Sequence, residues 1–577
     1  LLQKSIFLLQ RKGKNMRKVS PRLVAIMMAG AVTVTSITPV TGYQTITVNA
    51  ATDSQEKEAA QGYQTNLTGF DYKKGDWKET KDGLYSNAVD KGDCFAFSKT
   101  TAKNFVYSTD VTFKRNQGAA TLIFRFNNNL DNKECYAVNI DGGSHKCKLW
   151  RWQENSDYQL IDEKEVKATD DEKYTLKVVA YDSWISYYVN DTLVASTGDY
   201  TLQKDDKGQS TVLTEGSLGL LNWNGEMTFQ NTYYTELNDQ NTPELKNISV
   251  SSSTGDVEKA AQFTSTEPIM IQYVKNNAET VDLNIEKKNK NADVQVEYDG
   301  KTYNDGKNIP VKVGKNYITV KSTVQGENGQ TATLTYRVNV HRRAADKTYY
   351  NEAYRNQYHY SVKDGWGNDL NGLVKYKGTY HMFYQFYDDT KWGPMHWAHA
   401  TSKDLIHWEE QPIALYPDAN GAMFSGCIVA DEKNTSGLFG DGNEGGLVAL
   451  ITADGNGQRI KVAYSTDEGK TWKKTNKIAA DWSKDPLNNR DFRDPKVFRW
   501  ENKWFMVIAG GPLRIYSSDN LTDWKCESTY ADLHTECPDL YPIETKDGVK
   551  WVLSRGGRSY KVGDFKQVDG KWKFVAD

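Results

Sequence analysis

The sequence contains few cysteines and no marked excess of either charge. Its 577 residues include six cysteines and no CxxC pair; they are Cys94, Cys135, Cys147, Cys427, Cys526 and Cys537. Two alternatives stay open: a bridge between Cys135 and Cys147 on neighbouring strands, or unpaired buried thiols. The 72 basic and 75 acidic residues give a net charge of −3. Without a basic excess to attract phosphate polymers, nucleic acid is not expected as a partner.

Long Leu/Ala-rich helical stretches are also absent. Aromatic residues instead make up 12% of the chain, and there are 44 glycines. Aromatic and β-branched side chains pack well on pleated surfaces, so the composition favours an all-β fold class. The length exceeds what one ordinary core can hold, and three or four domains are expected.

The one hydrophobic run near the N-terminus is short. Met16 is followed by Arg17 and Lys18, then by the apolar stretch 23–32, and small residues allow cleavage after Ala50. This pattern predicts a signal peptide over 16–50 and an extracellular protein with no membrane insertion after cleavage. The run is too short and interrupted for a spanning helix. The residues before Met16 are expected to be upstream sequence or the result of a misplaced start.

Residues 65–236 alternate apolar and polar side chains in short runs, such as Phe105–Phe113, separated by turn signals. Alternation of this kind predicts a β-sandwich. The segment Gly216–Gly225 resembles the last strands of concanavalin-like jelly rolls, and the block is similar to family 66 carbohydrate-binding modules. That resemblance implies a fructan-binding module without assigning its binding residues. Trp150 and Trp152 share one side of a strand, where they could stack on a sugar or pack in the core.

A polar linker leads to a second block of short strands, over 245–342, which fits a small sandwich. This block resembles the cadherin-like bacterial domains that act as spacers, and no chemistry is assigned to it.

From Thr348 onward a turn signature recurs in a Trp-rich sequence. It appears at Ser402–Trp408, Ser465–Trp472 and Ser517–Trp524, so that the closing tryptophans are separated by 64 and 52 residues. Each copy has short strands on both sides. Recurrence at this period predicts a β-propeller with one copy in each blade.

The first strand of each propeller blade lines the central channel, so polar residues at those strand starts converge. Four such starts are readable: 368–372, 424–427, 492–495 and 536–540. Three of them carry an acid, namely Asp369, Asp494 and Glu536. Carboxylates brought together repel each other and are costly to bury unless they are used or paired. Three acids at equivalent positions form the pattern that a glycosidase needs.

Six motifs in order resemble those of glycoside hydrolase family 32, which includes invertases, inulinases and levanases. They are Trp366–Gly372, Phe383–Phe386, Trp392–Ser402, Phe424–Gly426, Arg493–Pro495 and Glu536–Cys537. The resemblance implies a five-bladed propeller as the catalytic domain, over 348–577. The family's fifth blade and C-terminal β-sandwich are not in this sequence, so we expect the domain to be C-terminally incomplete, with uncovered edges.

The resemblance also implies roles for single residues. Asp369 corresponds to the nucleophile and Glu536 to the acid and base of a retaining mechanism, in which the two carboxyl groups lie about 5–5.5 Å apart. Asp494 corresponds to a third acid that holds sugar hydroxyls, and Arg493 to a partner for a neighbouring carboxylate. The positions that contact the terminal fructose are matched by Asn368, Gln385, Trp392 and Ser425.

Two residues depart from the family pattern. Leu370 stands where proline is usual and Cys427 where serine is usual. Neither change removes a reacting group, so we expect activity to be retained, although Cys427 is expected to perturb a hydrogen bond near the pocket. His396 and His399 have HxxH spacing, but on a strand they point to opposite faces. We predict no metal and no cofactor.

The sequence therefore predicts a secreted, monomeric, exo-acting hydrolase of the β-fructosidic bonds in levan, inulin or sucrose. A fructosyltransferase that uses the same acids is one alternative. A non-catalytic fructan-binding surface protein with a decayed propeller is the other, and is favoured only by Leu370 and the missing blade. Linkage preference and cell-wall association stay open.

Overall fold

The computed structural model describes residues 62–577 except 116, 154–156, 199–214, 266, 327–328, 443 and 456. The predicted signal peptide over 16–50 lies outside the described residues. Strands dominate the described chain, together with two single-turn 3-10 helices, η3 (Asp346–Thr348) and η4 (Trp482–Lys484). Among these residues no helix is long and apolar enough to cross a membrane. The all-β fold class predicted from composition is confirmed.

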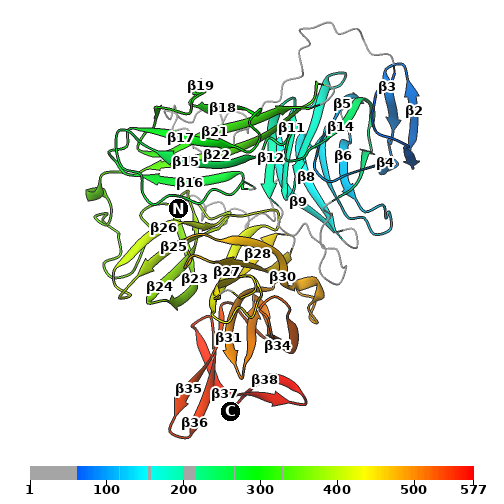
Figure 1. Ribbon diagram of the computed structural model, residues 1–577. Coiled ribbons are helices and arrows are strands. Elements are labelled where there is room, and N and C mark those ends of the chain that lie inside the picture. Colours follow the sequence, from blue (N-terminus) through cyan, green and yellow to red (C-terminus); the bar gives the residue numbers. More distant parts are fainter. Residues whose placement is uncertain are drawn as a thin grey trace, which may run out of the picture. The chain divides into compact units, whose positions relative to one another are not determined.

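The first part of the described chain forms two seven-stranded sheets (Figure 1). One sheet has the order β1-β4-β13-β6-β7-β8-β9 and the other β12-β11-β10-β5-β14-β3-β2. The strands are β1 (Asp71–Lys73), β2 (Asp76–Thr80), β3 (Gly83–Asn87), β4 (Asp93–Ala102), β5 (Phe105–Arg115), β6 (Ala119–Phe126), β7 (Cys135–Asp141), β8 (Lys146–Gln153), β9 (Asp157–Glu165), β10 (Lys173–Tyr181), β11 (Trp184–Val189), β12 (Thr192–Gly198), β13 (Gly216–Trp223) and β14 (Glu226–Glu236). The alternation seen in the sequence places one face of each sheet in a shared core.

The cysteines of this sandwich do not form a bridge. The register of β7 against β8 places Cys135 opposite Trp152 and Cys147 opposite Ile140. All six cysteines are free thiols, so of the two alternatives the unpaired one holds. Trp152 is buried and packs edge-on against Phe95, with ring centroids 6.4 Å apart. Packing therefore occupies this tryptophan.

The second block contains a three-stranded sheet, β15-β17-β20, and a five-stranded sheet, β16-β22-β21-β18-β19. Its strands are β15 (Leu245–Ser251), β16 (Ile269–Val274), β17 (Thr280–Lys287), β18 (Asp293–Tyr298), β19 (Lys301–Thr302), β20 (Ile309–Pro310), β21 (Gly314–Gln325) and β22 (Thr331–Arg342). Its hydrophobic core continues into the first sandwich, because Tyr336 packs edge-on against Trp184 at 4.7 Å and the Tyr188 hydroxyl donates to the Thr333 carbonyl at 2.7 Å. This block is therefore packed against its neighbour rather than isolated.

The rest of the chain forms four sheets, each of four antiparallel strands in sequence order (yellow-green to red in Figure 1). The strands are β23 (Trp366–Tyr376), β24 (Thr379–Tyr387), β25 (His396–Ser402), β26 (Trp408–Leu415); β27 (Ala422–Asp431), β28 (Gly446–Gly455), β29 (Gly457–Ser465), β30 (Lys473–Asp481); β31 (Arg493–Trp500), β32 (Lys503–Ala509), β33 (Gly511–Ser518), β34 (Lys525–Thr535); and β35 (Pro538–Thr545), β36 (Gly548–Arg555), β37 (Ser559–Val568), β38 (Lys571–Ala576). The first strands of successive sheets, β23, β27, β31 and β35, contact one another. This is the arrangement of propeller blades.

The recurring turn signature links the third and fourth strands of three blades. In each copy the closing tryptophan donates its indole N–H to a carbonyl three residues earlier, at Leu405, Gly469 and Leu521. The third copy begins one residue later than the sequence suggests. Ser518, not Ser517, accepts the backbone N–H groups that close the turn, and Asn520 stands where the other copies have aspartate. Asparagine and aspartate both accept such backbone bonds, which conceals the shift in the sequence.

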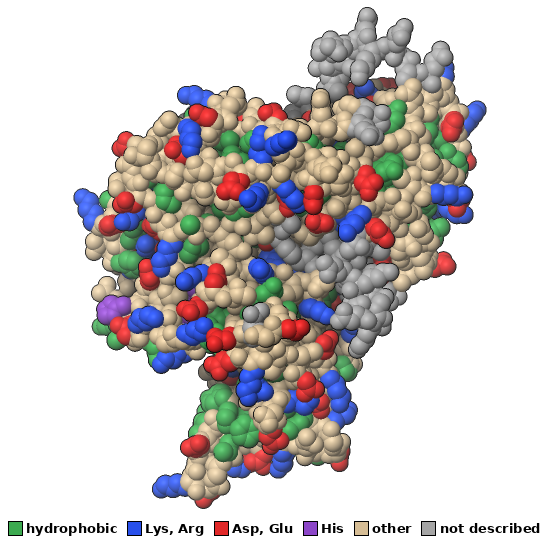
Figure 2. Space-filling view, viewed as in Figure 1, with side chains coloured by type: hydrophobic (Ala, Val, Ile, Leu, Met, Phe, Trp, Pro, Cys, Tyr) green, Lys and Arg blue, Asp and Glu red, His purple; other side chains and the backbone are tan. Residues whose placement is uncertain are grey.

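Two of the blades expose apolar side chains. On β23, Leu370 and Leu373 are 57% and 62% exposed, and on the last sheet Tyr560 is 70% exposed. Figure 2 shows hydrophobic side chains gathered over this last sheet, at the lower end of the view. Uncovered apolar faces are typical of interaction surfaces.

Candidate active site

Local irregularities in three inner strands create the site. The ladder between the first and second strand of a blade shifts between Gly367 and Leu370 in β23, between Met423 and Gly426 in β27, and between Arg493 and Lys496 in β31. A β-bulge bends a strand and turns side chains away from the regular alternation. The bulged residues are Asn368 and Asp369, Phe424 and Ser425, and Asp494 and Pro495. Asn368, Asp369, Ser425 and Asp494 are thus each presented by a β-bulge.

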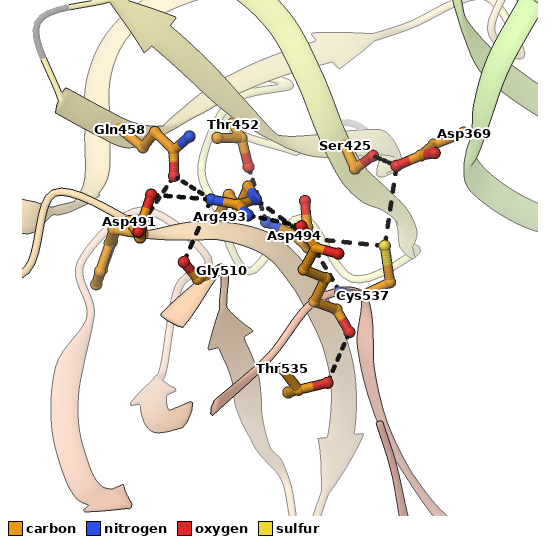
Figure 3. A network of polar contacts seen from close by, with 12 residues as sticks. Asp369, Ser425, Thr452, Gln458, Asp491, Arg493, Asp494, Gly510, Thr535 and Cys537 are labelled. Carbon is orange, nitrogen blue, oxygen red and sulfur yellow. Dashed lines mark hydrogen bonds and ion pairs between the residues drawn. The ribbon is translucent and has the colours of Figure 1, made fainter. Parts of the chain in front are cut away.

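The bulges open onto one pocket of about 1030 Å³. Asp369, Asp494 and Glu536 all line it, so the structure brings together the three acids that the sequence singled out. Four of the predicted substrate-binding residues, Asn368, Gln385, Trp392 and Arg493, also line the pocket. The fifth, Ser425, is bonded directly to Asp369 (Figure 3).

A chain of hydrogen bonds ends on Asp369. The Asn368 amide donates to Gln385 Oε1 at 3.0 Å, and Gln385 Nε2 donates to Ser425 Oγ at 2.8 Å. Ser425 Oγ in turn donates to Asp369 Oδ2 at 2.8 Å. Gln385 and Ser425 are almost fully buried, so their side chains have little freedom to reorient. Residues predicted to contact sugar therefore also hold the carboxylate of Asp369 in place.

Asp494 is the buried acid of the pocket. Its backbone has φ +61°, a left-handed conformation that is uncommon for a residue other than glycine. Its N–H donates to Thr452 Oγ1 at 3.0 Å, and its Oδ2 accepts the Cys537 N–H at 2.9 Å. Burial raises the pKa of Asp494 and the charge of Asp369 adds to the rise, against the opposing effects of the Cys537 N–H and Arg493. A strained, poorly solvated carboxylate of this kind is typical of functional sites.

Cys537 lies between the two aspartates. Its Sγ is 3.6 Å from Asp494 Oδ2 and 3.9 Å from Asp369 Oδ2, as Figure 3 shows. Burial, followed by the charges of these two acids, raises the pKa of the thiol to about 12. The side chain is therefore a neutral, weak hydrogen-bond donor rather than a nucleophile.

Arg493 connects Glu536 to the wall of the pocket. Its Nη2 donates to Glu536 Oε1 at 2.8 Å. Its Nη1 lies 3.2 Å from each of three acceptors: Gln458 Oε1, Asp491 Oδ1 and the Gly510 carbonyl. The Glu536 side chain is 61% exposed, in contrast to the buried Asp494. A guanidinium anchored on one side thus orients an otherwise exposed carboxyl group, as the sequence predicted for this arginine.

Trp392 stands at the rim with half of its surface exposed, packed edge-on against Phe424 at 5.6 Å. An exposed indole held in this way is a suitable platform for a sugar ring.

The other residues singled out in the sequence lie away from the reacting groups. Cys427 Sγ accepts the Val497 N–H at 3.2 Å and lies outside the pocket lining, so its expected effect on the pocket is indirect at most. His399 stacks on Phe383 at 4.1 Å, whereas His396 packs against Tyr416, in agreement with the predicted opposite faces. Within the described residues, no three His, Cys, Asp or Glu side chains are grouped to hold a metal.

Sequence reasoning missed three contacts. Thr452 and Gln458 support Asp494 and Arg493 from a neighbouring blade, and no local signal marks them. Cys537 follows Glu536 in a recognised motif, but nothing in the sequence places its thiol between two distant aspartates.

A propeller whose inner strands bring three carboxylates into one open pocket has the architecture of a glycoside hydrolase. Comparison with models of protein families leads to the same class of enzyme. Residues 359–573 match the glycosyl hydrolases family 32 N-terminal domain, the family that the six motifs resemble. Residues 62–234 match a 3-keto-alpha-glucoside-1,2-lyase-like domain, and residues 245–343 a cadherin-like beta sandwich domain.

The chain is 66% identical over 505 residues to a fructan beta-fructosidase of Streptococcus mutans, covering 87% of this chain and 35% of that protein. It is 45% identical over 251 residues to a levanase of Bacillus subtilis, covering 38% of this chain and 36% of that protein. The chain thus spans about a third of the length of these relatives. A solved carbohydrate binding module, CBM66 from Bacillus subtilis, is 27% identical, covering 30% of this chain and 98% of that one, with a TM-score of 0.26.

Proposed function

We propose that this protein hydrolyses the β-fructosidic bonds of fructans from the chain end, with retention of configuration. The observation that carries the proposal is the convergence of Asp369, Asp494 and Glu536 on one pocket, with Asp369 held by the hydrogen bond from Ser425. A fixed carboxylate and a solvent-accessible carboxyl group in one pocket are what a double displacement requires.

In the first step the terminal fructosyl unit lies against the wall formed by Asn368, Gln385 and Trp392. Asp369 attacks the anomeric carbon while Glu536 gives its proton to the glycosidic oxygen. The bond between carbon and leaving oxygen breaks, the shortened chain departs with that proton, and a covalent fructosyl-enzyme forms.

In the second step Glu536, now a carboxylate, takes a proton from water. The water oxygen attacks the anomeric carbon, the bond to Asp369 breaks, and fructose is released. Asp494 accepts hydrogen bonds from the sugar hydroxyls and stabilises the positive charge that develops on the ring in both steps. Arg493 keeps Glu536 directed at the leaving oxygen.

Levan, inulin and sucrose are the proposed substrates, supported by the names of the relatives. An extracellular location is supported by the predicted signal peptide and by matched relatives such as an extracellular exo-inulinase of Aspergillus niger. The sandwich over 65–236 is proposed to hold fructan, the block over 245–342 to link it to the catalytic domain over 348–577, and the protein to act as a monomer.

Substitution of the two reacting acids tests the mechanism. In the full-length protein, Asp369→Ala and Glu536→Ala should each lower kcat on levan by about 10⁴-fold or more, as for other covalent mechanisms. Asp519→Ala, which removes an exposed acid outside the pocket, is the matched control. With an aryl fructoside, whose leaving group needs no proton, Glu536→Ala should still release the phenol and Asp369→Ala should not.

Wild-type turnover of levan by both variants would refute the proposal. Transfer to a second sugar would use the same two acids, so the products formed from sucrose separate hydrolysis from transfer. Free fructose as the main product supports hydrolysis.

A further inference from the structure

The loop 416–421, which connects β26 of the first blade to β27 of the second, is in contact with both preceding domains. The Tyr416 hydroxyl accepts the Ile271 N–H of the second block at 3.0 Å. The Ala419 N–H donates to the Gly198 carbonyl of the first sandwich at 2.9 Å. The first sandwich is therefore docked on the catalytic domain, and its proposed role in holding fructan does not explain why.

Two side chains of the first sandwich form this docking contact. Arg151 of β8 is paired with Gln159 of β9, and its Nη2 donates to Gln159 Oε1 at 2.7 Å. Both Nη atoms of Arg151 also donate to Asn420 Oδ1, at 3.3 Å each, and Gln159 Nε2 donates to the Ala419 carbonyl at 2.7 Å. Arg151, Gln159 and Asn420 are at most 4% exposed. Buried polar groups that satisfy one another in this way fix the contact, because separating the two surfaces would remove their partners.

The hairpin between β28 and β29 packs directly on the same loop. A Cβ on Gly421 would lie 1.8 Å from the Asp454 carbonyl oxygen. A Cβ on Gly455 would lie 2.5 Å from the Asn420 carbonyl oxygen and 2.8 Å from Gln159 Nε2. Only glycine allows backbones to approach so closely. The sandwich, the loop and the hairpin therefore meet at Gly455, and close packing of this kind transmits displacements from one part to the next.

The same hairpin carries Gln458, which holds the arginine of the pocket. Asp454 and Gln458 are paired across the β28–β29 ladder, and Gln458 Nε2 donates to Asp454 Oδ1 at 3.0 Å. Gln458 Oε1 accepts the Phe492 N–H at 2.8 Å and Arg493 Nη1 at 3.2 Å (Figure 3). Arg493 Nη2 in turn donates to Glu536 Oε1 at 2.8 Å. A continuous series of contacts thus runs from the first sandwich to the proposed acid and base.

We propose that the first sandwich is a structural part of the active site, in which Arg151 and Gln159 are positioning residues for Glu536. They act through the loop between β26 and β27 and the hairpin between β28 and β29, which together keep Arg493 in place. The inference rests on the proposed function, since the position of Glu536 matters only if it is the acid and base. A sandwich that merely held fructan would affect polymeric substrates alone. A sandwich that positions Glu536 affects every substrate that needs its proton.

The test uses a disaccharide substrate, either sucrose or a β-2,6-linked fructose dimer. Gln159 lies outside the pocket lining, so a short substrate bound at the acids does not touch it. In the full-length protein, Gln159→Ala should lower kcat on the disaccharide by about 3- to 30-fold with little change in KM, the size of effect expected through a packed network. Arg151→Met, which removes the other half of the contact and keeps an apolar stem, should give the same pattern.

A second substrate separates positioning of the acid from a general distortion of the pocket. Release of 4-nitrophenol in the first turnover of 4-nitrophenyl β-fructofuranoside should change by less than about twofold in Gln159→Ala, because this leaving group needs no proton from Glu536. Combining Gln159→Ala with Gln458→Ala should reduce kcat on the disaccharide by less than the product of the two single losses, because both substitutions act on Arg493.

Gln117→Ala is the matched control. Gln117 is an exposed glutamine of the same sandwich whose side chain contacts Arg115, and its loss should change neither substrate. An unchanged kcat on the disaccharide, or an equal loss in the first-turnover release of 4-nitrophenol, would overturn the inference and leave the proposed function standing. If the unsubstituted protein released no fructose from levan or from either disaccharide, the proposed function itself would fall. All variants are assayed well below their melting temperatures, so that unfolding does not contribute.

Discussion

Two buried acids of the propeller, Asp418 and Asp494, have opposite environments. The side chain of Asp418, in the loop between β26 and β27, is completely buried, with Lys461 Nζ at 3.0 Å and Lys474 Nζ at 3.5 Å. Lys474 also pairs at 2.7 Å with Glu267 of the preceding sandwich. The side chain of Asp494 is nearly as buried, but its ion pair, with Arg493 Nε, is longer, at 3.8 Å. The same guanidinium also forms an ion pair with Glu536.

The two environments move the pKa in opposite directions. Burial by itself would raise both values. For Asp418 the charges of Lys461 and Lys474 outweigh burial and hold its pKa well below the usual range. For Asp494 burial prevails and its pKa is raised. The propeller thus contains one buried acid that is paired with two lysines and one buried acid that shares its arginine with Glu536. The second acid is the one proposed to contact the substrate.

The largest expected effect is the loss of the paired acid. Asp418→Ala leaves Lys461 and Lys474 buried beside each other without their shared anion, so we expect the free energy of unfolding to fall by about 3–5 kcal/mol. Denaturant unfolding of the full-length protein, followed by tryptophan fluorescence, measures the change. A loss below about 1 kcal/mol would show that the cluster of Asp418, Lys461 and Lys474 does not stabilise the fold.

The under-paired acid should behave in the opposite way. Asp494→Asn should lower kcat on levan by about 10²–10³-fold, because the group proposed to stabilise the developing charge is neutralised. The free energy of unfolding of this variant at pH 7 should rise, since the amide has no charge to desolvate. Steady-state kinetics and unfolding measured on one preparation test both parts. A variant that loses stability as well as activity would contradict the comparison.

The pH dependence of the free energy of unfolding should distinguish Asp418 from Asp494, because the two residues contribute with opposite sign. Asp418 has a lowered folded-state pKa, so its contribution is fully present above the unfolded value of 3.8 and is lost as the pH falls below it. The stability deficit of Asp418→Asn should therefore shrink on acidification. Asp494 has a raised folded-state pKa, so its ionised form destabilises the fold as the pH rises above 3.8. The gain from Asp494→Asn should accordingly appear with rising pH and vanish in acid. Unfolding midpoints between pH 3 and 8 provide the measurement.

The smallest effect is expected from an exposed ion pair. Lys503 and Asp519 lie 2.7 Å apart on the surface of the third blade, with Asp519 82% exposed. Asp519→Ala should change the free energy of unfolding by less than about 1 kcal/mol, because solvent and salt screen the pair. A larger loss would mean that burial is not what distinguishes the Asp418 cluster.

The acids of the site could be predicted from the sequence because each one lies in a short motif at the start of a strand. Asp369, Asp494 and Glu536 were found in this way, and so were Arg493 and the residues that orient Asp369. The bulges could not be predicted, since a bulge is a property of the register between two strands, and the sequence does not determine that register. For the same reason Thr452 and Gln458, which act across blades, gave no signal.

The remaining differences have similar causes. Cys135 and Cys147 lie on adjacent strands, but the pairing register, which the sequence leaves undetermined, keeps them apart. The third turn signature was displaced by one residue because two consecutive serines, Ser517 and Ser518, fit the same pattern. The block over 245–342 resembles a spacer in its sequence. Its packing against the first sandwich could not be predicted, because it consists of contacts between residues far apart in the chain.

The bulges in β23, β27 and β31 are confined to the innermost ladder of each blade. Behind them, the second and third strands pair without interruption in all three blades. A substitution or a one-residue insertion in a bulge therefore reshapes the pocket while the hydrogen-bonded frame stays intact. On the proposed function, we therefore expect variation in the bulges to alter the contacts with the sugar more than the ladders between the second and third strands.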